Sequence, residues 1–110
     1  MTLPRFAYAW RFTINPGLRA KFLAGYLPGG EWAQLFSRDP GYIRTELLQD
    51  DTNPDQYVTV DYWTSKSARD AFQIRYAKEF AELDLKCEAY TLHEEFIGDF
   101  TLVEQTTPGV

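Results

Sequence analysis

Cysteine and histidine are almost absent from this chain of 110 residues, which contains one of each, Cys87 and His93. A lone cysteine excludes a disulfide framework and a thiolate metal site, and we expect Cys87 to be a small residue that helps pack a helix. The sequence also lacks metal-ligand spacings, a nucleophile–base pair, a phosphate-binding glycine loop and a nucleotide-binding fingerprint. We therefore predict no metal site.

Clusters of Lys and Arg are lacking as well, and the formal net charge is -5. This balance argues against nucleic acid and anionic membranes as partners. No apolar run approaches the roughly 20 residues of a membrane span. The first residues also lack the basic-then-apolar order of a signal peptide. We therefore expect a soluble, cytoplasmic protein.

Apolar residues are plentiful: 45% of the chain is hydrophobic and 16% is aromatic. At this length the composition predicts one domain with a substantial core that needs no disulfides. We assign the domain to residues 1–104 and a flexible tail to residues 105–110. The aromatic share is high for a small domain, which suggests a dimer interface, a ligand cavity or both.

Residues 57–72 predict a strand that turns directly into a helix. The first half is rich in β-branched and aromatic residues and has no Gly or Pro, as expected for a half-buried strand. Ser65 can cap a helix whose apolar face carries Ala68, Phe72 and Tyr76. The helix must then fold back onto the sheet, with Trp63 at the corner.

Residues 5–14 alternate strictly between two faces. One face is large and apolar (Phe6, Tyr8, Trp10, Phe12, Ile14), and the other is small with one cation (Ala7, Ala9, Arg11, Thr13). This pattern predicts a central strand with helices over its first face. The second face is too apolar to remain in water beside Val58, Val60 and Tyr62, and it predicts a sheet-to-sheet homodimer.

The other segments complete the fold. We expect a helix over 18–27, a short helix over 31–37, a strand over 42–49, helical pieces from about 65 and over 77–88, and a last strand over 91–104. Gly98 marks either a bulge in that strand or a point of close approach. The order strand–helix–strand–strand–helix–strand predicts an α+β, ferredoxin-like βαββαβ sandwich with a four-stranded antiparallel sheet and all helices on one face.

Four motifs carry a resemblance to a known family: Trp10–Gly17 (WRFTINPG), Asp39–Ile43 (DPGYI), Val60–Ala68 (VDYWTSKSA) and Phe96–Phe100 (FIGDF). Over about residues 6–100 the chain resembles the antibiotic-biosynthesis-monooxygenase-like dimeric α/β-barrel proteins. That family includes cofactor-independent oxygenases of aromatic polyketides and quinols, haem-degrading enzymes, isomerases and members without known activity. The oxygenase branch implies catalysis without a cofactor.

The haem-degrading branch is similar in layout but not at its functional positions. Its Asn on the first strand corresponds to Trp10, its helical Trp to Phe72, and its His lies near Glu82. Because all three residues differ, the resemblance does not imply haem degradation here.

Seven aromatic residues are candidates for the walls of a cavity between sheet and helices: Tyr8, Trp10, Trp32, Phe36, Trp63, Phe72 and Tyr76. A planar aromatic substrate would need such walls and a few polar contacts. The alternative is that these rings simply fill the core.

The polar candidates each have a functional and a structural interpretation. His93 is the default general base because its pKa is ordinarily near neutrality, and the alternative is a hydrogen-bonded or solvated side chain. Arg11 and Asp61 lie within strands, where they form a cross-strand or cross-dimer ion pair or hold a polar end of the substrate. Tyr8, Tyr62 and Tyr76 are donors to a developing oxyanion or merely core-rim residues.

The resemblance to the oxygenase branch implies the oxidation of a small electron-rich aromatic, such as a quinol or anthrone, by a cofactor-independent monooxygenase. His93 and Arg11 are the predicted catalytic residues. The predicted substrate-binding residues are Trp10, Trp32, Trp63, Phe72, Tyr76 and Asp61. The alternative is a non-catalytic dimer of the same fold that binds a small molecule or has a structural role.

Overall fold

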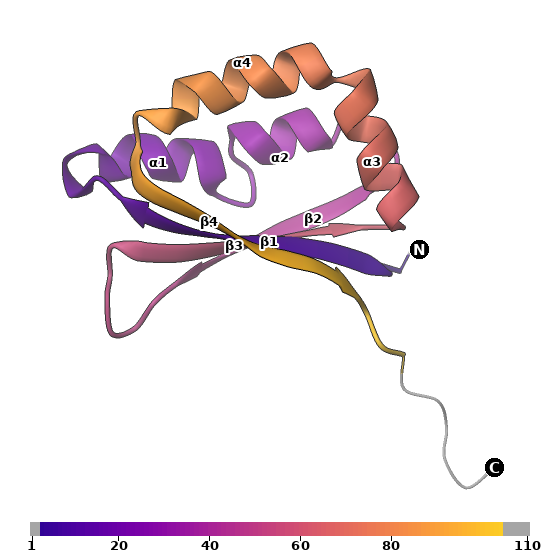
Figure 1. The fold of residues 1–110 in the computed structure, drawn as a ribbon, viewed down its shortest axis with the longest axis horizontal. Helices are drawn as coiled ribbons and strands as arrows, with labels where there is room; N and C mark the ends of the chain where they lie inside the picture. Colours follow the sequence, from indigo (N-terminus) through magenta and orange to yellow (C-terminus); the bar gives the residue numbers. More distant parts are fainter. Residues whose placement is uncertain (1–2, 105–110) are drawn as a thin grey trace, which may run out of the picture.

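The computed structural model describes residues 3–104, which form one antiparallel sheet covered on one face by helices (Figure 1). The strands β1 (Phe6–Ile14), β2 (Tyr42–Gln49), β3 (Gln56–Trp63) and β4 (Thr91–Thr101) lie in the order β2-β3-β1-β4. The α+β ferredoxin-like fold predicted from the sequence is confirmed. The tail predicted at residues 105–110 lies outside the described residues.

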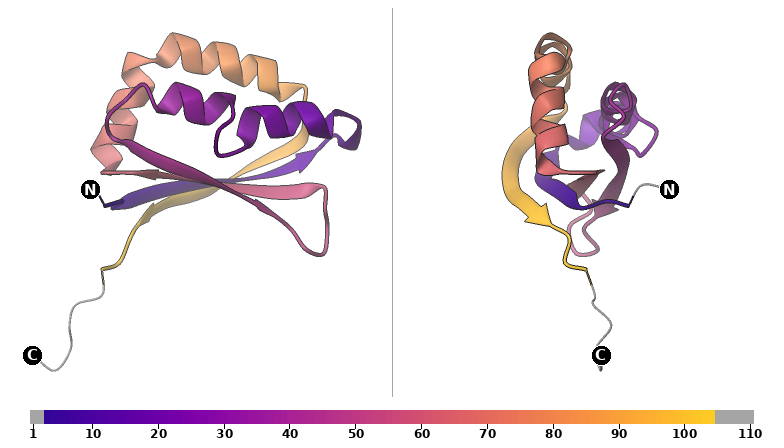
Figure 2. Two further views of the ribbon diagram at one scale, coloured as in Figure 1. Left: turned by 180° about the vertical axis from the view of Figure 1, so that it is seen from behind. Right: turned by 90° about the vertical axis from the view of Figure 1, so that its right-hand side faces the viewer.

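The helical layer has two arms. A 3-10 turn (Pro16–Leu18), α1 (Arg19–Tyr26) and the short α2 (Glu31–Phe36) follow β1, and α3 (Lys66–Arg75) and α4 (Ala77–Glu88) connect β3 to β4. Figure 2 shows both arms on the same side of the sheet and β4 curving away from the end of α4, and β4 then pairs with β1 at the edge of the sheet. No helix among the described residues is long and apolar enough to cross a membrane.

The alternation in β1 determines which face the helices cover. Phe6, Tyr8, Phe12 and Ile14 are buried under the helices, where an aromatic core forms. Ala7 and Ala9 face the other way, and both are nearly inaccessible between their neighbours on β3 and β4. We call the helix-covered side of the sheet the inner face and the opposite side the outer face.

The predicted turn from strand to helix is confirmed at residues 63–68. Ser65 is the N-cap of α3, and its hydroxyl accepts a hydrogen bond of 3.0 Å from the Ala68 amide. Trp63 and Phe72 are fully buried, and their ring centroids lie 5.3 Å apart. This contact fixes α3 against the end of β3. The two predicted helical pieces are separated at Tyr76, which lies between α3 and α4.

β4 is an edge strand with a bulge. Its register against β1 shifts between Ala9 and Trp10, whose partners are Gly98 and Phe96. Gly98 has a φ of 156°, a conformation that only glycine adopts without strain. The predicted bulge at Gly98 is therefore confirmed, and it helps β4 to curve beside the helical layer.

Candidate functional site

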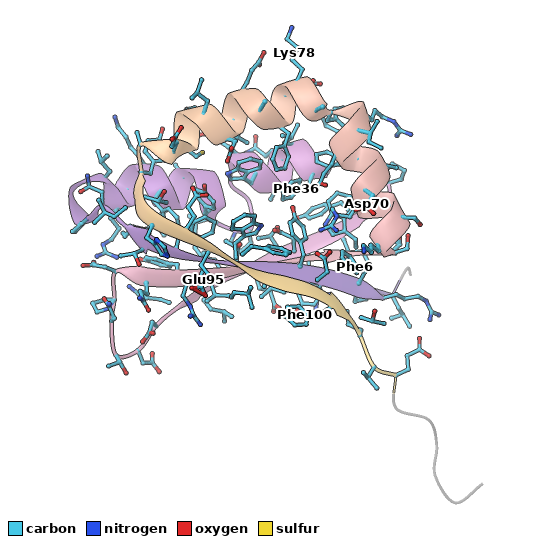
Figure 3. The ribbon with its side chains drawn as sticks, viewed as in Figure 1. Phe6, Phe36, Asp70, Lys78, Glu95 and Phe100 are labelled. Atoms are coloured by element: carbon cyan, nitrogen blue, oxygen red, sulfur yellow. The ribbon has the colours of Figure 1, made fainter. Side chains whose placement is uncertain are left out.

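A cavity of about 210 Å³ lies between the inner face of the sheet and the helices. Its walls are mostly aromatic rings from β1, α1, α2 and α4. The full lining comprises Tyr8, Trp10, Phe12, Tyr26, Trp32, Phe36, Thr45, Thr59, Asp61, Phe80, Asp84 and Glu94. Figure 3 shows Phe36 between α2 and the sheet, on the side that holds the cavity.

A row of polar side chains crosses the floor of the cavity. The strand register places Asp61 of β3 opposite both Tyr8 of β1 and Thr45 of β2. Antiparallel partners point to the same face, so all three side chains meet on the inner face. The Thr45 hydroxyl donates a hydrogen bond of 2.5 Å to Oδ1 of Asp61, and the Tyr42 hydroxyl lies 2.7 Å from Thr45 Oγ1.

Asp61 is a buried carboxyl without a cation. Only 5% of the residue is exposed, and no Lys, Arg or His among residues 3–104 forms an ion pair with it. Desolvation raises its pKa from the usual 3.8 to about 7, and the bond from Thr45 opposes this only in part. Asp61 therefore titrates near neutral pH.

Tyr8 is buried beside Asp61. Desolvation first and the Asp61 charge second raise the pKa of its phenol well above the ordinary value, so the hydroxyl stays protonated. The Arg69 guanidinium lies 4.7 Å above the Tyr8 ring centre. Arg69 is neutralised by a bidentate pair to Asp99, with both N–O distances at 3.0 Å. Arg69 therefore supports Tyr8 without supplying the missing cation to Asp61.

The mouth of the cavity is acidic. Asp84 of α4 and Glu94 of β4 line the cavity and are exposed to solvent. Partial burial, together with the nearby Asp84 and Glu88 charges, raises the pKa of Glu94. None of the described residues that line the cavity is basic. The entrance therefore repels anions and admits neutral or cationic molecules.

The structure divides the predicted substrate-binding residues into two groups. Trp10, Trp32 and Asp61 line the cavity. Trp32 is nearly buried, and its indole N–H has no hydrogen-bond partner among the described residues. By contrast, Trp63, Phe72 and Tyr76 belong to the packed core beside α3 and do not line the cavity. These three rings therefore fill the core, which is the alternative interpretation of the aromatic residues.

The two predicted catalytic residues lie away from the cavity. Arg11 is opposite Val58 on the outer face and pairs with Glu95 of β4 at 3.6 Å. The expected cross-strand ion pair thus exists for Arg11 but not for Asp61, because the two side chains point to opposite faces. His93 is exposed and opposite Thr13, also on the outer face. Their catalytic roles stay predictions that the cavity does not support.

Sequence reasoning missed several residues of the lining. Thr45 and Thr59 resemble ordinary strand residues, and only the strand register shows that they share a face with Asp61. Phe80 and Asp84 lie four residues apart on α4, a spacing that indicates one helix face. Glu94 and His93 are adjacent on β4 and therefore point to opposite faces of the sheet. Which of the two faces the cavity is determined by the register and bulge of β4 against β1.

The acidic residues of the cavity do not form a metal site. Among residues 3–104 there is no group of three or more His, Cys, Asp or Glu side chains that could hold an ion. The chemistry that this arrangement offers by itself is proton transfer by one carboxyl and hydrogen-bond donation by neutral hydroxyls, inside aromatic walls.

Comparison with known proteins identifies the fold and the family of the chain. The chain is similar to an Asn-to-Ala variant of SnoaB, a cofactor-independent oxygenase from Streptomyces nogalater, with 25% identity over 96% of this chain and 99% of that chain, at a TM-score of 0.75. A candidate antibiotic biosynthesis monooxygenase from Nitrosomonas europaea has the same fold, with 10% identity over 97% and 99% of the chains and a TM-score of 0.73. No curated protein matches the chain. Residues 6–83 match the antibiotic biosynthesis monooxygenase family, and the chain belongs to that family.

Proposed function

We propose that this protein is a cofactor-independent monooxygenase that oxidises a small, electron-rich hydroxyarene, quinol- or anthrone-like, in the cavity. The observation that carries the proposal is an aromatic cavity whose floor holds a carboxyl that titrates near neutrality. Membership of the monooxygenase family and the similarity to SnoaB over nearly the whole chain support the reaction type.

The reaction that fits begins with removal of a proton from the substrate. The electron-rich anion then transfers an electron to O₂, and the radical pair combines to form a C–O bond, giving a peroxide on the ring carbon. Protonation and cleavage of the O–O bond release water, while the hydrogen on that carbon leaves as a proton. A hydroxyarene with a free para position and O₂ thus become a quinone and H₂O. The protein contributes a dry pocket and stabilisation of the anion.

A homodimer formed through the outer face completes the proposal. Phe100 of β4 lies opposite Ala7 on this face, on the side away from the helices in Figure 3, and is 49% exposed. Leu48 of β2 lies opposite Val58 and is 54% exposed. Apolar side chains from edge to edge of the sheet favour burial against a second sheet.

The test combines binding with oxygen consumption. Purified protein is heated with naphthols, quinols and anthrone, and oxygen uptake and quinone formation are then followed for each compound that raises the melting temperature. A ligand at about 100 times its Kd stabilises by about 2.7 kcal/mol, an easily measured shift. We expect uptake of one O₂ per quinone formed.

Two variants show whether the reaction occurs in the cavity. Thr59→Leu adds bulk to the cavity floor, whereas Thr13→Leu makes the same change on the outer face. Only Thr59→Leu should abolish both binding and turnover. Binding without oxygen uptake would favour the non-catalytic binding protein, and uptake that both variants retain would place the reaction elsewhere.

A further inference from the structure

We propose that Asp61 and Tyr8 form a base–donor pair: Asp61 Oδ2 accepts the proton of a neutral hydroxyarene, and the Tyr8 hydroxyl donates a hydrogen bond to the oxyanion that results. This inference rests on the proposed function. It deepens that function by naming the group that accepts the proton, the group that donates a hydrogen bond to the resulting anion, and the charge of the substrate when it enters.

The hydrogen bonds on the cavity floor orient Asp61 for this role. Thr45 occupies Oδ1 as a donor and is in turn within hydrogen-bond distance of Tyr42. Among residues 3–104, Oδ2 of Asp61 and the hydroxyl of Tyr8 have no partner, and neither belongs to the buried polar atoms sealed off from solvent. Both residues line the cavity. One acceptor and one donor are therefore free at neighbouring positions of two paired strands.

The surroundings hold each group in the required protonation state. Around Asp61 the charged or titratable groups are Tyr8 on β1, Tyr26 on α1, Tyr42 on β2, Arg69 on α3, Asp84 on α4, and Glu94 and Asp99 on β4. Arg69 is paired to Asp99, and within the part of the chain that the structure describes no other cation pairs with Asp61 to hold it ionised. Burial raises the pKa of Asp61 to about 7 and that of Tyr8 much further. Near pH 8 the carboxyl is thus a base while the phenol remains a donor.

The same groups define the substrate class. Asp84 and Glu94 at the mouth and the absence of any basic lining residue disfavour a carboxylate or phosphate on the ligand. The pair therefore takes a molecule that enters neutral and loses a proton inside, such as a phenol, a naphthol or the enol form of an anthrone.

The experiment uses two probes, 1-naphthol and its methyl ether 1-methoxynaphthalene, which differ in the acidic hydroxyl. Calorimetric titrations with the wild type, Asp61→Asn, Tyr8→Phe and the control Asp51→Asn are made at pH 6 and pH 8. Asp51 is exposed in the β2–β3 turn and does not line the cavity. At pH 8 the wild type and the control should prefer naphthol by about tenfold, the effect of a hydrogen bond to a charged group. Asp61→Asn should bind the two probes about equally.

Oxygen uptake with 1-naphthol supplies the second readout. The kcat/KM of the wild type should rise with pH through an ionisation near 7, and Asp61→Asn should lose this ionisation and at least about a hundredfold in kcat. Tyr8→Phe should lose about a hundredfold in kcat, with KM little changed and the ionisation retained, because it removes a donor to the developing anion.

The outcomes separate the pair from the oxygenase reaction. If Asp61→Asn keeps the preference for naphthol, or keeps the wild-type rate and pH profile, the pair is overturned while the oxygenation stands. If the wild type discriminates the probes through Asp61 but consumes no oxygen, the oxygenation is overturned and the pair stands. Failure of the wild type to bind either probe overturns both.

Discussion

Replacing Asp61 by Asn should make the folded protein more stable at neutral pH. In the folded protein the carboxyl is buried, has no cation and has its pKa raised from 3.8 to about 7. Ionising this carboxyl therefore requires more free energy in the folded protein than in the unfolded chain. Asn is similar in shape and can still accept the bond from Thr45, but it cannot ionise.

The magnitude and its pH window follow from proton linkage. Below about pH 4 Asp61 is protonated in both states, so it causes no pH-dependent difference between wild type and variant. Between about pH 4 and pH 7 only the unfolded state has lost the proton, and the wild type loses about 1.4 kcal/mol of stability per pH unit relative to the variant. The difference should level off near 4 kcal/mol above pH 7, equivalent to roughly 15 °C in melting temperature.

Urea denaturation followed by tryptophan fluorescence at about pH 4, 5, 6, 7 and 8, with equal protein concentrations, measures this difference directly. The Asp51→Asn variant removes one exposed carboxyl of the same kind and should parallel the wild type throughout. A difference between Asp61→Asn and wild type that stays constant from pH 4 to pH 8 would refute the reasoning, because it would mean that Asp61 ionises as freely in the fold as in water.

Two further predictions concern the support of the site and the outer face. Asp99→Asn should destabilise by about 2 kcal/mol in urea denaturation, because the Arg69 side chain, 8% exposed, loses its bidentate partner. Asp70→Asn should cost less than about 0.5 kcal/mol, since Asp70 is half exposed, and equal losses would contradict this account. Val60→Arg on the outer face should halve the mass measured by light scattering, whereas the same change at Ile74, 80% exposed on α3, should not. A monomeric wild type would refute the dimer.

The fold was predictable because its signals are local and repeated. The alternation of β1, the N-cap at Ser65 and the glycine at residue 98 each report on the backbone of a few neighbouring residues. Such signals can be interpreted from the sequence without knowing which strands pair. The two faces of the sheet were predicted correctly for the same reason, since a period of two residues needs no tertiary information.

The site was predictable only in part, because its chemistry depends on register. The alternation of each strand already assigns Arg11 to the outer face and Asp61 to the inner face, but it does not show that a cavity opens at Asp61 or that Arg11 pairs with Glu95. His93 was the predicted base because histidine is the residue type that ordinarily titrates near neutrality, whereas the carboxyl that faces the cavity is an aspartate whose pKa is raised by burial. The desolvation of Asp61 depends on the tertiary structure, so no local sequence pattern predicts it.

The cost of Asp61 is itself an argument about function. The free energy of unfolding of a domain of this size is roughly 5–15 kcal/mol. A carboxyl whose ionisation lowers it by about 4 kcal/mol at neutral pH therefore removes a large share of the stability. Structural carboxyls in this protein avoid that cost: Asp99 is paired with Arg69, and the pKa of Asp99 is lowered accordingly. Asp61 has only the Thr45 hydroxyl and an open cavity beside it. Since no cation among residues 3–104 pairs with Asp61 to offset this loss of stability, the compensating interaction is expected from a ligand that gives Asp61 a proton.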